Sequence, residues 1–163
     1  NDPDCNASVI SAFEQAANPD RVFFGIHQQT NLDEYHDCLD LSSIDCPSHP
    51  ICSRLWQIRI SRVTDKQAHG PTWGRVMADK HFGHETFYLI TDSHTFFRPR
   101  WDELMIEIWT QTRNEYAVIT HYPKGENQMA SAVQTWQTDP SRGSAYHICG
   151  TFWESSENHM PRN

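Results

Sequence analysis

Helix-like and strand-like hydrophobic patterns alternate along this chain, and this alternation limits the possible folds more than any other feature. Apolar residues recur at helical spacing in three segments, which predict helices at residues 9–17, from residue 71 onward, and at 101–109. Short apolar runs predict strands at residues 21–27, 55–60, 87–91 and 116–120. Because strands that alternate with helices are typical of a mainly parallel sheet flanked by helices, we expect an α/β fold.

The remaining segments and the composition set wider limits. Residues 28–53 are polar and rich in Asp and Cys, and residues 124–163 show little periodicity, so both are predicted to be mostly loop. A length of 163 residues suits one domain, residues 1–163. Thirteen basic residues against 21 acidic residues give a net charge of −8 without any Lys/Arg-rich run, which argues against a nucleic-acid partner. No apolar run approaches the roughly 20 residues of a membrane span.

Asp92, Ser93 and His94 directly follow the predicted strand at residues 87–91. Open α/β sheets bind ligands at the carboxyl ends of their strands. A carboxylate and an imidazole separated by one residue can turn toward one divalent cation, and mixed oxygen and nitrogen ligands suit Mn²⁺. The alternative is that Asp92 or Ser93 only caps a turn or the next helix.

Several segments, in order along the chain, resemble one known family. They are residues 1–5 (NDPDC), 18–29 (NPDRVFFGIHQQ), 68–75 (AHGPTWGR), 85–94 (ETFYLITDSH), Phe97 with Trp101-Asp102, and 117–123 (AVITHYP). Together they resemble the GlcNAc-transferase family (glycosyltransferase family 60), whose best-known members are protein-hydroxyproline N-acetylglucosaminyltransferases. The resemblance runs from residue 1 to about residue 123 and then becomes faint.

This resemblance implies a GT-A-like nucleotide-sugar-binding fold, a mainly parallel sheet flanked by helices. The implied activity is a metal-dependent, retaining transfer of N-acetylglucosamine from UDP-GlcNAc to a protein acceptor, with hydroxyproline as one such acceptor. Residues 1–123 would form the nucleotide-sugar-binding part, and residues 124–163 the start of the acceptor part. We expect the chain to be a partial catalytic domain, truncated at both ends, which leaves the catalytic residues unknown and the fragment alone inactive.

The implied cofactor is a divalent metal, Mn²⁺ for preference, bound by Asp92 and His94. The spacing of these two ligands is similar to that in the mucin-type polypeptide N-acetylgalactosaminyltransferases, where a more distant His completes the site. We expect the third ligand beyond Asn163, with His121 and His147 as substitutes inside the chain. Such a cation would neutralise the charge of a departing diphosphate.

Further substrate-binding candidates lie at the predicted ends of the strands. Gln28 and Gln29 follow the strand at 21–27 and could hydrogen-bond a base or ribose, or simply be polar loop residues. Arg75, one turn into the helix that starts near residue 71, could contact phosphate or pair with a neighbouring acid. Ser93 and His121 belong to the same expected rim.

The Cys-rich loop supports a second class of function. Cys38, Cys46, His49 and Cys52 could form a zinc site, which would make the chain a non-catalytic binding module. Their spacing departs from that of a short paired knuckle, so free thiols are the favoured interpretation and a disulfide between two of them is a third. We expect a cytoplasmic protein, with the alternative of the Golgi lumen and an anchor outside this chain.

Overall fold

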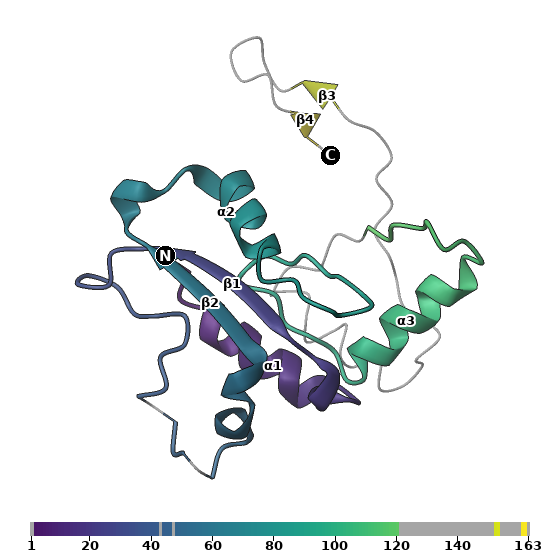
Figure 1. The fold of residues 1–163 in the computed structure, drawn as a ribbon, viewed down its shortest axis with the longest axis horizontal. Helices are drawn as coiled ribbons and strands as arrows, with labels where there is room; N and C mark the ends of the chain where they lie inside the picture. Colours follow the sequence, from purple (N-terminus) through teal and green to yellow (C-terminus); the bar gives the residue numbers. More distant parts are fainter. Residues whose placement is uncertain (1, 43, 47, 121–151, 154–160, 163) are drawn as a thin grey trace. The chain divides into compact units, whose positions relative to one another are not determined.

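The computed structural model describes residues 2–42, 44–46, 48–120, 152–153 and 161–162. The chain divides into two compact units, Asn1–Asn114 and Glu115–Asn163. The first unit contains the helices α1 (Cys5–Gln15), α2 (Gly70–Asp79) and α3 (Trp101–Gln111), and the strands β1 (Phe24–Gln29) and β2 (Ile58–Val63) (Figure 1). Short 3₁₀ helices cover Pro19–Arg21, Pro50–Gln57 and Asp65–Gln67.

Strands β1 and β2 pair in parallel, from Phe24 opposite Ile58 to Gln29 opposite Val63. Side chains of a strand alternate between the two faces of its sheet. Phe24 and Ile26 pack on one face against the core that includes α1. On the other face, His27 contacts Trp73 of α2 at 5.0 Å between ring centroids. The two helices therefore lie on opposite sides of the strand pair, as Figure 1 shows.

Close packing of α2 explains the glycine in β1. A Cβ atom built on Gly25 would lie 2.7 Å from Cβ of His81 and 3.1 Å from the carbonyl oxygen of Ala78. Any larger side chain would push the end of α2 away from the strand.

The core of the first unit lies between α1, the strand pair and the loops beside them. Its buried apolar residues are Val9, Ala12, Phe13, Val22, Cys38, Ile51 and Ile58. Gln57 is fully buried among them, and its amide donates to the carbonyl oxygens of Pro19 at 2.8 Å and Val22 at 2.6 Å. These bonds satisfy a polar side chain that would otherwise destabilise the core.

The predicted helices are confirmed, and two of the four predicted strands are confirmed with shifted bounds. The strand expected at 21–27 is β1, and the strand expected at 55–60 is β2, three residues further along, because Pro50 begins a 3₁₀ helix that continues to Gln57. The parallel pairing supports the α/β class, but two strands alone do not identify a GT-A fold.

The strands expected at 87–91 and 116–120 are wrong: neither segment has regular secondary structure. Both have strand-like composition, yet a strand also needs a hydrogen-bonded neighbour, and composition supplies none. Tyr88 and Ile90 are more than half exposed.

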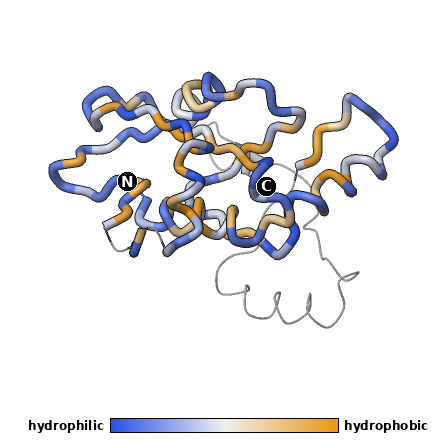
Figure 2. Tube along the Cα trace, turned by 60° about the horizontal axis from the view of Figure 1, so that its bottom comes forward, coloured by the Kyte–Doolittle hydropathy of each residue, from blue (hydrophilic) through white to orange (hydrophobic). Residues whose placement is uncertain are grey.

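Among the described residues of the second unit, β3 (Phe152–Trp153) and β4 (Pro161–Arg162) pair antiparallel. The prediction that 124–163 is mostly loop otherwise falls outside the described residues. Figure 2 shows short apolar and polar stretches alternating along the trace. No helix in the described part of the chain is long and apolar enough to cross a membrane.

Candidate active site

Asp92 lies within the irregular segment between α2 and α3 and forms an ion pair with an arginine of α2. Its Oδ1 atom is 2.7 Å from an Nη atom of Arg75, and both side chains are more than half exposed. Of the two roles considered for Arg75, pairing with a neighbouring acid is therefore the one present in this structure. A phosphate contact by Arg75 stays a prediction. Asp92 Oδ2 has no partner among the residues that the structure describes.

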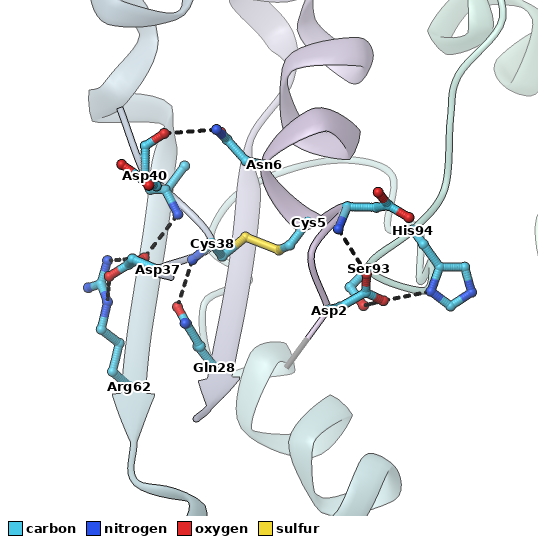
Figure 3. The surroundings of a disulfide bond; sticks show 12 residues. Asp2, Cys5, Asn6, Gln28, Asp37, Cys38, Asp40, Arg62, Ser93 and His94 are labelled. Carbon is cyan, nitrogen blue, oxygen red and sulfur yellow. Dashed lines mark hydrogen bonds and ion pairs between the residues drawn. A yellow bond between two sulfur atoms is a disulfide. The ribbon is translucent and has the colours of Figure 1, made fainter. Parts of the chain in front are cut away.

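Ser93 and His94 contact an acid from the far end of the chain. The Ser93 hydroxyl donates to Oδ2 of Asp2 at 2.6 Å, and Nδ1 of His94 lies 2.7 Å from the same oxygen (Figure 3). An ionised carboxylate can only accept hydrogen bonds, so Nδ1 of His94 carries the hydrogen. In the neutral imidazole this leaves Nε2 as the atom with a free lone pair. Figure 3 shows Nε2 on the side of the ring away from Asp2.

Electrostatics reinforces this contact. Burial alone would raise the pKa of Asp2, but hydrogen bonds from Ser93 and His94 outweigh burial and lower it. The hydrogen bond to Asp2 raises the pKa of His94, with further help from the charges of Asp2 and Asp92. In mildly acidic solution the contact is therefore an ion pair.

A covalent bond holds the segment that carries Asp2. The backbone N–H of Asp4 donates to Oδ1 of Asp2 at 3.0 Å, and α1 begins at the next residue, Cys5. Cys5 forms a disulfide with Cys38 (Figure 3). The backbone N–H of Cys38 then donates to Oε1 of Gln28 in β1 at 3.2 Å. A chain of contacts thus runs from the sheet to His94.

Gln28 and Gln29 have structural partners in this molecule. Gln28 is buried and bonds Cys38, while its Nε2 atom is buried without a hydrogen-bond partner among the described residues. Gln29 points to the other face, where its amide group accepts from the backbone N–H of His69 at 3.0 Å and donates to the carbonyl of Gly70 at 3.3 Å. A role for either side chain with a base or ribose stays a prediction.

A second polar cluster lies on the face covered by α2. Nδ1 of His27 is 2.8 Å from the Ser61 hydroxyl, and Nε2 of His81 is 3.0 Å from the same hydroxyl. Burial, with the nearby charges of His81 and Lys80, lowers the pKa of His27. His27 was predicted only as the end of a buried strand, since nothing in the sequence indicates that residues 27, 61 and 81 meet.

The cysteine interpretations require a correction. Cys5 pairs with Cys38, and Cys46 pairs with Cys52. The favoured free thiols and the zinc site at Cys38, Cys46, His49 and Cys52 are therefore wrong, and the alternative of a disulfide between two of the loop cysteines is confirmed by Cys46–Cys52. His49 instead accepts from the backbone N–H of Ile51 and lies 3.7 Å from Glu14. A zinc-organised binding module needs free cysteine thiolates, and these cysteines form disulfides instead. Cys149, His121 and His147 lie outside the described residues.

The binding of a divalent cation by Asp92 and His94 stays a prediction. Nε2 of His94 lies on the side of the ring away from Asp2 (Figure 3), and Oδ2 of Asp92 has no hydrogen-bond partner among the described residues. Nitrogen and oxygen donors of this kind match Mn²⁺. Among the described residues no group of three or more His, Cys, Asp or Glu side chains gathers around one point. If Asp92 and His94 bind a cation, substrate oxygens or water would have to supply the remaining ligands.

A family model described as Glycosyltransferase (GlcNAc) matches residues 33–142, well over half of the chain. The chain belongs to this glycosyltransferase family. The match includes Arg75, Asp92, Ser93 and His94, and it continues past residue 123, where the resemblance noted from the sequence fades. No curated protein and no solved structure matches the chain. Membership of this GlcNAc glycosyltransferase family indicates a transferase that uses a sugar donor and an acceptor.

Proposed function

We propose that this GlcNAc transferase uses UDP-GlcNAc as donor, modifies a protein acceptor, and depends on a divalent cation held by Asp92 and His94. The observation that carries the proposal is the outward-facing Nε2 of His94, two residues from a carboxylate, inside the matched family region. Arg75, which contacts Asp92, adds a positive charge beside the same place.

The proposed chemistry follows from the donor. The UDP leaving group gains negative charge as the sugar–phosphate bond breaks. A bound cation would neutralise that charge and act as a Lewis acid on the diphosphate. Arg75 is suited to a bidentate phosphate contact, because its guanidinium is held at the site by one Asp92 oxygen and remains about half exposed. Retention of configuration and hydroxyproline as acceptor follow from the resemblance to glycosyltransferase family 60.

The disulfides bear on the compartment. Two disulfides among the described residues favour an oxidising environment over the cytoplasm. Of the two locations expected from the sequence, we therefore propose the Golgi lumen.

The test measures UDP binding and GlcNAc transfer on matched variants of the full-length protein. With Mn²⁺ present, UDP should bind tightly to the wild type and weakly after chelation, as calorimetry would show. Asp92→Asn and His94→Ala should each lower transfer to a hydroxyproline peptide by about 100-fold or more, because removing a group that stabilises developing charge typically costs this much. The control Asp33→Asn removes the same charge from an exposed side chain that has no hydrogen-bond partner among the described residues, and it should leave transfer unchanged.

Two results would contradict the proposal. Equal UDP affinity with and without chelator would remove the cation from the mechanism. Full transfer activity in folded Asp92→Asn and His94→Ala proteins would remove these two residues from the site.

A further inference from the structure

Asp2 is 92 residues from His94 in sequence, yet its carboxylate accepts a hydrogen bond from the imidazole at 2.7 Å. The family match begins only at residue 33, so Asp2 lies outside it. We propose that Asp2 is a positioning residue, which holds His94 in the tautomer and orientation that present Nε2 to the divalent cation. This inference rests on the proposed function and adds to it a residue that acts through His94.

The hydrogen bond between His94 and Asp2 is short. Oδ2 of Asp2 lies 2.7 Å from Nδ1 of His94, a length typical of a charge-assisted bond. Metal-binding histidines commonly donate their second ring N–H to a carboxylate, which fixes the ring and makes the binding nitrogen more basic. With Nδ1–H committed to Asp2, the free electron pair is on Nε2, which Figure 3 shows facing away from Asp2.

Asp2 also contacts the residue before His94. The same Oδ2 atom accepts the hydroxyl hydrogen of Ser93 at 2.6 Å. Asp2 thus contacts Ser93 and His94, the two residues that directly follow Asp92. Because this segment pairs with no strand among the described residues, a side-chain contact of this kind helps to fix its conformation.

Asp2 is itself held in place by its neighbours. Its side chain is about one quarter exposed, whereas that of His94 is 61% exposed. The backbone N–H of Asp4 occupies Oδ1 of Asp2, and Cys5, three residues after Asp2, is bonded to Cys38 beside β1. The acid is therefore the better anchored member of the pair.

The experiment compares three variants of the full chain with the wild type. Asp2→Ala removes the acceptor. Asp4→Ala is the matched control, because it removes one negative charge from the same segment but no side-chain hydrogen bond to His94. His94→Ala is the reference for loss of the ligand. Mn²⁺ alone, without nucleotide, is titrated by calorimetry, and ¹⁵N NMR reports the imidazole tautomer of His94 in metal-free protein at a pH where the ring is neutral.

The inference predicts that wild-type His94 carries its hydrogen on Nδ1, and that Asp2→Ala moves it toward Nε2. Mn²⁺ affinity should fall about 10- to 100-fold in Asp2→Ala, as for other residues that orient a metal-bound histidine. Asp4→Ala should retain the wild-type tautomer and lose much less affinity, because only a screened charge is removed.

Each other outcome overturns the inference. An Nε2–H tautomer in the wild type would do so without any variant, so a poorly folded Asp2→Ala protein does not remove the test. Equal losses of Mn²⁺ affinity in Asp2→Ala and Asp4→Ala would show that Asp2 acts only through its negative charge and not by positioning His94. If His94→Ala weakens Mn²⁺ binding and Asp2→Ala does not, only the positioning role fails. If His94→Ala binds Mn²⁺ like the wild type, the proposed cation site itself fails.

Discussion

The packed region of the first unit, α1 with β1, β2 and their loops, differs sharply from the segment that follows α2. The packed region holds all seven buried apolar residues among those described, and both disulfides. The segment from residue 82 to α3 instead exposes Phe82, Phe87, Tyr88, Leu89, Ile90, Phe96, Ile106 and Ile108. Asp92, Ser93 and His94 belong to this second segment. Their positions therefore depend on individual polar contacts, while burial stabilises the region against which they lie.

Truncation of a core side chain should show the largest difference between the two regions. Phe13 is 5% exposed and packs against Phe24 with ring centroids 5.5 Å apart. Phe13→Ala should lower the free energy of unfolding by about 3–5 kcal/mol, because it removes a buried ring and leaves a cavity. Leu89→Ala should change it by only about 0.5 kcal/mol, because Leu89 is 43% exposed. Urea unfolding of both variants checks this, and similar losses would contradict the comparison.

Removal of the disulfides should rank the covalent contributions within the packed region. The Cys5–Cys38 bond closes a sequence separation of 33 residues and the Cys46–Cys52 bond one of 6. Replacing both cysteines of a pair by Ala should cost about 3–4 kcal/mol for the long loop and about 2 kcal/mol for the short one, since a longer loop loses more chain entropy when closed. Urea titrations at one pH measure both. A larger loss for the Cys46–Cys52 pair would show that entropy of the unfolded chain does not dominate.

Asp102 of α3 should show a smaller, pH-dependent effect that joins the two regions. Its carboxylate accepts from the backbone N–H groups of Ala17 and Asn18, each at 2.8 Å. Burial would raise the pKa of Asp102, but these hydrogen bonds outweigh burial and lower it.

Because the folded-state pKa of Asp102 is depressed, its stabilisation is complete above the unfolded value near 4 and is lost as pH falls through the folded value. Asp102→Asn should therefore cost about 1 kcal/mol at pH 7 and less in strong acid. Unfolding free energies of wild type and variant between pH 2 and pH 7 measure the difference. A constant difference over this range would mean that ionisation of Asp102 does not contribute.

Local elements were predictable from the sequence where one face of the element meets a core. The helical spacing of Val9 and Phe13 predicted α1, and both side chains are buried there. The helix at 101–109 was also predicted from its helical spacing, but only part of its apolar face meets the core. Trp101 packs on the core and donates to the carbonyl of Ala12, whereas Ile106 and Ile108 are exposed. Periodicity indicates an apolar face without showing what covers it.

The candidate site could be predicted only in its local part. Asp92 and His94 are separated by one residue, so this pair can be recognised from the sequence alone, and the family match includes both residues. The contact of His94 with Asp2 and the Cys5–Cys38 bond join residues far apart in the chain. No propensity or spacing encodes such pairs, because they depend on how α1 is placed against the rest of the unit.

The order of the paired cysteines has a consequence for synthesis of the chain. The pairs Cys5–Cys38 and Cys46–Cys52 follow one another and do not interleave. A chain that emerges amino terminus first, at about 5–20 residues per second, exposes both partners of the first pair before Cys46 appears. Among these four cysteines the earliest available partner is thus the native one. The Cys5–Cys38 bond can therefore attach α1 to Cys38 before the segment with His94 has been translated.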